Sequence, residues 1–109
     1  MNETKCRAIV KERSMGGCEI CIANPGEQMH HRRNRSQGGR WEPQNIIHLC
    51  AHCHHHVTVN PKYSTQMGWT IQGTVDGNAP ETVPVWIRGR RCLLEDDGTV
   101  VVIPGEAAS

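Results

Sequence analysis

The amino-acid sequence predicts an α+β fold, and three observations support this class. A helical pattern covers residues 3–14, and a second one follows Cys50. From Trp69 onward the pattern changes to short apolar β runs, with Asp97-Gly98 as a hairpin signal between two of them. At 109 residues, we expect a single domain over 1–109.

Local signals place the elements along the chain. The first helix is expected to end at Gly16-Gly17, and the second near Asn60 because Pro61 cannot continue it. In the first half of the chain we expect a helix over 3–14 and strands over 28–32 and 45–49, joined by a polar loop over 32–43. A helix carrying His54 and a short helix over 61–67 should follow. The last part should contain strands within 69–75, 83–89 and 91–103.

The composition indicates that the fold needs disulfides or a bound metal ion for stability. The chain has no Phe and only four large aromatic rings, so its apolar core is small. No secretory apolar segment follows Met1, and no run of eighteen apolar residues occurs, so we expect a cytoplasmic protein without a membrane span. Thiols in a reducing compartment bind metal more often than they form disulfides.

Four of the six cysteines form two knuckles of equal spacing. A two-residue gap allows both sulfurs of a knuckle to face one ion, and two knuckles complete a tetrahedral thiolate site. We therefore predict a structural zinc ion, with free or disulfide-bonded cysteines as the alternative. Cys6 and Cys92 have no matching partner and are expected to be buried as small apolar side chains. The predicted zinc ligands are Cys18, Cys21, Cys50 and Cys53.

Positive charge and histidine concentrate in the first part of the chain. Residues 1–60 carry eight Lys and Arg against five Asp and Glu, and they contain all seven histidines. Residues 61–109 carry four Lys and Arg against six Asp and Glu. We therefore expect the chemistry, and any phosphate partner, to involve the first sixty residues.

Three histidines stand where short elements meet. His30 and His31 close the first strand, and His54 opens the helix directly after Cys53. A metal-dependent nuclease needs a divalent ion with open positions and a general base that deprotonates water. Two imidazoles on one ion and a third beside it would meet both needs. Adjacent strand residues point to opposite faces, so the strand must end or twist at His30 and His31.

These motifs resemble the HNH endonuclease family, in particular its small zinc-knuckle members encoded by bacteriophages. The resemblance rests on HHRRNRSQGG, on PQNIIHLCAHCHHHVTVNP, and on an Asn fourteen residues after His31 and nine before His54. It covers about residues 7–70, which we expect to form the nuclease core, with a β-rich extension over 71–109. The implied fold is a ββα-metal finger.

The resemblance also implies roles for individual residues. His30 and His54 would bind the catalytic metal, His31 would be the general base, and Asn45 would hold the loop and orient His31. Many relatives carry a histidine four residues after His54, where this chain has Thr58. We expect the other histidines to be solvated or to face phosphate: His48, His52, His55 and His56. The loop arginines expected to clamp DNA are Arg32, Arg33, Arg35 and Arg40.

The predicted activity is metal-dependent hydrolysis of DNA, with Mn²⁺, Co²⁺, Ni²⁺, Zn²⁺ or Mg²⁺ as the catalytic ion. The alternative is a zinc-stabilised nucleic-acid-binding module that does not cleave. A third hypothesis, a DNA-packaging accessory beside a phage terminase in a bacterial host, is compatible with the first and rests on the family association.

Overall fold

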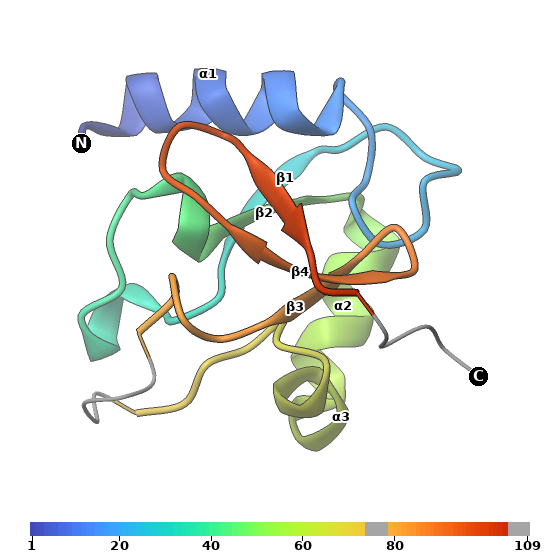
Figure 1. Ribbon diagram of the computed structural model, residues 1–109. Helices are drawn as coiled ribbons and strands as arrows, with labels where there is room; N and C mark the ends of the chain where they lie inside the picture. The colour runs from blue at the N-terminus through green and yellow to red at the C-terminus, as the bar shows by residue number, and fades with distance from the viewer. Residues whose placement is uncertain (74–78, 105–109) are drawn as a thin grey trace.

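A computed structural model describes residues 1–73 and 79–104 of the chain. Its first element is the helix α1 (Glu3–Ser14), which confirms the expected range. The Asn2 side chain caps the first turn, and Met15 in the left-handed conformation ends the helix. In Figure 1, α1 lies across the top of the molecule, above both sheets.

The next elements form a hairpin followed by a helix. Strand β1 (Gln28–His31) pairs antiparallel with β2 (Ile46–Leu49), so that His30 lies opposite Ile47. Two short 3-10 helices, η1 (Arg35–Gln37) and η2 (Pro43–Asn45), lie in the connection between the strands. Helix α2 (Ala51–Val59) starts directly after β2. This order is the ββα arrangement implied by the family resemblance.

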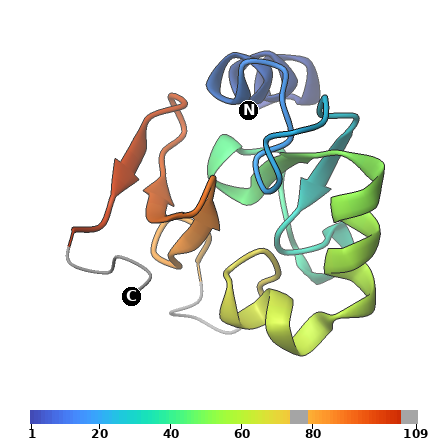
Figure 2. The same ribbon diagram turned by 90° about the vertical axis from the view of Figure 1, so that its right-hand side faces the viewer.

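A second sheet follows the short helix α3 (Pro61–Gln66). It is antiparallel, with the strand order β3 (Val85–Ile87), β4 (Arg90–Leu94) and β5 (Val100–Val102). Figure 2 shows this sheet on one side of the molecule and α2 and α3 on the other. The mixture of helices and antiparallel sheets confirms the predicted α+β class.

The prediction of a strand over 69–75 is wrong for residues 69–73, the part of this segment that the structure describes. The backbone N–H groups of Trp69 and Thr70 donate to the carbonyl of Ser64, and the N–H of Ile71 donates to the carbonyl of Arg32. These bonds tie the segment to α3 and to Arg32, the residue after β1, so residues 69–73 join no ladder. Positions 74 and 75 of the expected strand, and 105–109 of the expected extension, lie outside the described residues.

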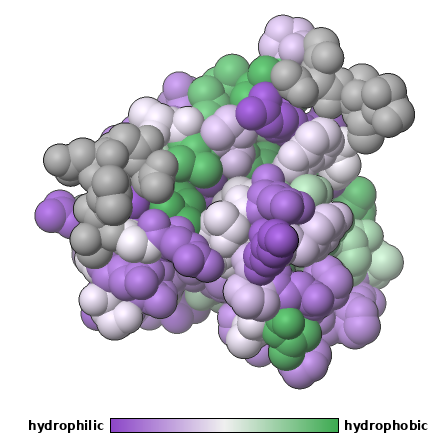
Figure 3. Space-filling model, turned by 90° about the horizontal axis from the view of Figure 1, so that it is seen from below, coloured by the Kyte–Doolittle hydropathy of each residue, from purple (hydrophilic) through white to green (hydrophobic). Residues whose placement is uncertain are grey.

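The buried core is small and uses cysteine as an apolar residue. Cys6 is fully buried on the inner side of α1 and Cys92 is 1% exposed, which confirms the interpretation of these two residues. The main buried cluster joins Leu49, Trp69 and Leu94 with the cysteines of the two knuckles. The face seen from below in Figure 3 is mostly hydrophilic, with apolar side chains in small groups. Among the described residues, no helix has the length and apolar character needed to cross a membrane.

Candidate metal centre and nuclease site

The four knuckle cysteines come together at one point of the fold. Cys18 and Cys21 lie in the turns after α1, while Cys50 precedes α2 and Cys53 lies in its first turn. All four sulfur atoms lie within 4.8 Å of one another. Ligands about 2.3 Å from one ion in a tetrahedron are about 3.8 Å apart, and Cys21 Sγ and Cys50 Sγ are 3.8 Å apart. The donor set and its spacing therefore fit a structural zinc ion.

Hydrogen bonds around Cys50 favour its thiolate form. The backbone N–H of Cys53 donates to Cys50 Sγ at 3.4 Å, and Asn24 Nδ2 donates at 3.6 Å. Burial acts to raise the pKa of Cys50, but these hydrogen bonds outweigh it and lower the pKa to about 6. Burial, with the neighbouring thiols, raises the pKa of Cys53. Metal binding requires thiolates, so these hydrogen bonds favour the form of Cys50 that binds zinc.

His30 and His54 approach each other across the junction between β1 and α2. Their ring centroids are 5.3 Å apart, and the ring planes cross at 63°. Two imidazoles that share one ion at ordinary metal–nitrogen distances have centroids about 5 Å apart. The pair is therefore spaced to hold one divalent ion between the two rings.

The other nitrogen of His30 is already engaged. Its Nε2 lies 2.8 Å from the carbonyl oxygen of Trp69, and because a carbonyl only accepts, Nε2 is the donor. Burial lowers the pKa of His30 to about 4, so the ring is neutral and Nδ1 keeps its lone pair. A backbone carbonyl that fixes the tautomer in this way is typical of histidine ligands.

His31 points to a different neighbour than His30. The centroids of the His31 and Trp41 rings are 4.5 Å apart, with the ring planes at 77°. His31 Nε2 is buried without a hydrogen-bond partner among the described residues. Burial and then the positive charge of Arg35 lower the pKa of His31. Strand β1 ends at this residue, and His30 and His31 both line one cavity of about 250 Å³ together with Thr58. Both histidines therefore line one cavity at the end of the strand, while their rings contact different neighbours.

Asn45 is buried and fastens the loop between β1 and β2. Its Oδ1 accepts from the backbone N–H of Arg33, and its Nδ2 donates to the carbonyls of Arg33 and Arg40. The backbone carbonyl of Asn45 also accepts from Arg32. These contacts hold both ends of the basic loop that follows His31.

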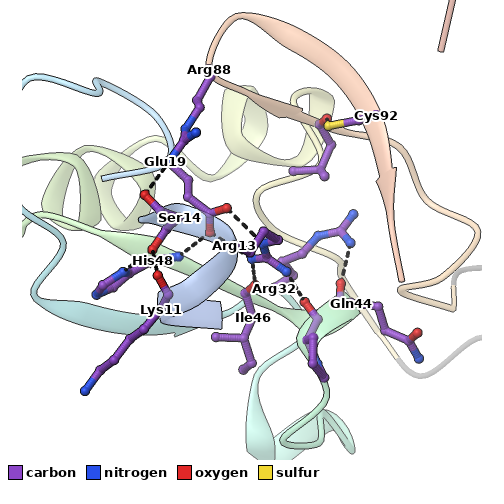
Figure 4. A network of polar contacts seen from close by, with 12 residues as sticks. Lys11, Arg13, Ser14, Glu19, Arg32, Gln44, Ile46, His48, Arg88 and Cys92 are labelled. Carbon is purple, nitrogen blue, oxygen red and sulfur yellow. Dashed lines mark hydrogen bonds and ion pairs between the residues drawn. The ribbon is translucent and has the colours of Figure 1, made fainter. Parts of the chain in front are cut away.

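The structure corrects the expectation that Arg32 contacts DNA. Its side chain is 1% exposed, and its guanidinium donates to four backbone carbonyls, those of Gly68, Gln44, Pro80 and Val83. Figure 4 shows the hydrogen bond from this guanidinium to the carbonyl of Gln44. All three guanidinium nitrogens donate to backbone carbonyls of this chain. Arg32 therefore stabilises the fold and is not available to a phosphate.

The other loop arginines remain accessible. Arg35 and Arg40 are exposed, and Arg33 is partly buried. Arg35 begins η1, beside Asn34, which lines the histidine cavity. This loop therefore presents positive charge next to the candidate site.

The remaining histidines divide into two groups. His52, His55 and His56 are exposed on α2, as expected. His48 is 4% exposed and its Nδ1 lies 2.8 Å from Ser14 Oγ, so the expectation that it is solvated is wrong. Its place on β2 beneath α1 explains the burial, because all four residues of β2 face protein.

Sequence reasoning missed the groups that support the site. The carbonyl of Trp69, the ring of Trp41 and the amide of Asn24 hold His30, His31 and Cys50 respectively. None of them follows a spacing rule for ligands. No pattern in the sequence indicated that Trp69 would contact His30.

Comparison with known families agrees with this geometry. Residues 18–59 match the model of the family described as HNH endonuclease. The match confirms that this segment is similar to the HNH family, and it contains all four knuckle cysteines and the residues His30, His31, Asn45 and His54. An HNH domain indicates nuclease activity on DNA. No curated protein and no solved structure matches the chain significantly.

Proposed function

We propose that the protein is a metal-dependent endonuclease that hydrolyses DNA phosphodiester bonds. The observation that carries this proposal is the approach of His30 and His54 to 5.3 Å beside a cavity lined by His31. The HNH match over 18–59 supports the same conclusion independently.

The proposed roles follow from what each side chain already contacts. His30 through Nδ1 and His54 would hold the divalent ion, which supplies Lewis-acid stabilisation of negative charge at the phosphate. His31 would accept a proton from the attacking water, and its lowered pKa keeps the imidazole neutral for this task. The water oxygen would form a bond to phosphorus while the bond to the 3′ oxygen breaks. The 3′ oxygen would take a proton from solvent water, which gives a 5′-phosphate and a 3′-hydroxyl.

The surrounding loop would position the nucleic acid. Arg33, Arg35 and Arg40 would contact backbone phosphates, while Asn45 keeps the loop in place. The four-cysteine zinc site would fix the start of α2, and His54 directly follows one of its ligands. Action beside a phage terminase, in the cytoplasm of a bacterial host, extends this proposal and rests on the family resemblance.

One observation favours the alternative of a binding module without cleavage. At the position of the third histidine found in many relatives, Thr58 donates its hydroxyl to the carbonyl of His54 at 2.9 Å. The hydroxyl is therefore already hydrogen-bonded to the helix backbone. The proposed ligand set then consists of two imidazoles. A weakly held ion would give slow cleavage, and an absent one would give none.

A nicking assay separates the two functions. The purified protein is incubated with supercoiled plasmid and Mn²⁺ or Mg²⁺, beside His31→Ala and the control His55→Ala. We expect the parent protein and His55→Ala to nick the plasmid, and His31→Ala to be about 10² to 10⁴ times slower. Plasmid binding without nicking in either metal would establish the binding module, and an unaffected His31→Ala would disprove the base assignment.

A further inference from the structure

The outer edge of the second sheet carries three consecutive exposed valines. Val100, Val101 and Val102 form β5, and their exposed fractions are 38%, 42% and 44%. Within the described parts of the chain, β5 pairs only with β4. Figure 2 shows β5 at the outer margin of the molecule. Proteins usually protect such an edge with charge or a bulge, because its free backbone groups can pair with another strand.

The hydrogen-bond pattern identifies the backbone groups on this edge. The N–H of Ile103 donates to the carbonyl of Arg91, so residue 103 directs its backbone groups toward β4. In an antiparallel ladder this direction alternates from residue to residue. Val101 therefore also faces β4, while Val100 and Val102 direct their N–H and C=O groups outward.

We propose that this edge binds a second copy of the same chain, through antiparallel pairing of β5 with β5 about a twofold axis at Val101. Val100 of one copy then lies opposite Val102 of the other, and the reverse holds across the axis. Because these are the outward-facing residues, the two pairs exchange four backbone hydrogen bonds. The pairing is isologous, as a twofold interface requires.

The side chains of Val100 and Val102 are only partly covered by the described residues of their own chain. Val102 lies opposite Cys92, and Val100 lies opposite Leu94, yet the β4 residues are 1% exposed while both valines are exposed. A cavity of about 420 Å³ lies along Val100 and Val102. In the proposed dimer, each of these valines gains a valine of the second copy as a cross-strand neighbour.

Charge complementarity favours a second copy in this orientation. The exposed turn before β5 contains Glu95, Asp96 and Asp97, while Arg90 is exposed on β4 beside the other end of β5. An antiparallel arrangement brings the acidic turn of each copy toward Arg90 of the other. A parallel arrangement would place the two acidic turns together, which is unfavourable. Pro104 lacks an N–H and stops the ladder, so we expect a weak dimer with a small interface.

Sedimentation velocity over a concentration series tests this interface. We expect the mass to rise from 12.2 kDa toward twice that value as the protein approaches about 1 mM, the range of a weak association. Val101→Lys puts two like charges at the axis and should leave a monomer at every concentration. Val59→Lys, at a 55% exposed position on α2, is the matched control and should dimerise like the parent. A parent protein that stays at 12.2 kDa overturns the proposal, as does a dimer that Val101→Lys leaves intact.

Charge reversal tests the orientation separately. Asp96→Arg and Arg90→Glu should each weaken the dimer several-fold, because each places like charges opposite one another across the interface. The double variant restores opposite charges and should recover the parent affinity. Circular dichroism checks that every variant is folded. If both single variants dimerise normally, or if the double variant is no tighter than they are, the antiparallel orientation is wrong.

Discussion

Arg13 and Glu19 form a two-pronged ion pair in the interior of the protein. Arg13 Nε donates to Glu19 Oε2 at 2.9 Å and Nη2 donates to Oε1 at 2.8 Å, with side-chain exposures of 2% and 1%. Arg13 also donates to the carbonyls of Pro43 and Ile46, and Glu19 accepts from the N–H of His48 (Figure 4). The pair therefore joins α1, the first cysteine knuckle and β2.

Removing Arg13 should destabilise the protein strongly. Arg13→Met leaves the Glu19 carboxylate buried without its counter-charge, which costs about 3–5 kcal/mol of unfolding free energy. The matched control is Arg7→Met, whose ion pair with Glu3 is 42% and 48% exposed and worth at most about 1 kcal/mol. Urea denaturation of both variants measures the difference. Equal losses in the two variants would contradict a special role of the buried pair.

Zinc should be required for folding. Cys53→Ser removes one of four ligands, so we expect loss of about one equivalent of zinc and of most helical signal in circular dichroism. The control Cys92→Ser is buried but outside the cluster, and a hydroxyl can keep the bond that Cys92 Sγ makes to the carbonyl of Val85. It should retain its zinc. A folded Cys53→Ser variant without zinc would refute a structural zinc site.

Elements defined by local signals were predicted well from the sequence. The helix over 3–14, the strand pair and the Asp97-Gly98 hairpin depend on neighbours along the chain, and the structure confirms each of them. The two cysteine knuckles also come together as expected. Each knuckle is a local turn, and their tertiary contact was predicted from the need for four thiolates on one zinc ion.

Distant contacts explain the errors. The carbonyls that enclose Arg32 come from residues 12 to 51 positions away, so its sequence neighbours, a run of polar and charged residues, gave no sign of its burial. The same applies to His48, which pairs with Ser14 across 34 residues. In the candidate site, histidine spacing identified residues that do lie together, but Trp69, 39 residues from His30, was invisible to it.

Substitution of Arg32 should therefore affect stability, whereas substitution of Arg35 should affect DNA binding. Arg32→Met leaves four backbone carbonyls without their donor, so we expect thermal unfolding to shift down by at least several degrees. Arg35→Met should leave stability unchanged within about 0.5 kcal/mol, because the side chain is exposed. It should instead reduce the salt dependence of DNA binding by about one unit in log–log slope. Unchanged salt dependence in Arg35→Met would remove this residue from the proposed DNA contact.

Binding of the activating metal should depend on His54 and not on His31. The zinc-loaded protein, titrated with Mn²⁺ in a calorimeter, should bind one further ion. His54→Ala should weaken this binding at least tenfold, since it removes one of two imidazoles, while His31→Ala should leave it within about twofold. His55→Ala, on the exposed side of α2, controls for loss of any neighbouring histidine. Normal Mn²⁺ binding by His54→Ala would mean that the ion is held elsewhere.

The choice of metal follows from the nature of the two proposed ligands. Imidazole nitrogens are borderline donors that suit Mn²⁺, Co²⁺ or Ni²⁺ better than the strongly hydrated Mg²⁺. We expect cleavage with Mn²⁺, Co²⁺ or Ni²⁺ to exceed cleavage with Mg²⁺ at equal concentration, measured as plasmid nicking. A strict requirement for Mg²⁺ would indicate an oxygen-rich ligand set and would contradict the assignment of His30 and His54.

The site should tighten when a third imidazole is supplied. Thr58 lies one helical turn after His54, and residues four apart on a helix share a face. Thr58 also lines the cavity next to His30 and is exposed, so a larger side chain finds room there. We therefore expect Thr58→His to bind Mn²⁺ about tenfold or more tightly by calorimetry. Thr58→Gln has a similar size without the imidazole and should not bind Mn²⁺ more tightly than the parent. If Thr58→His binds no better than Thr58→Gln, the ion does not lie between α2 and the end of β1.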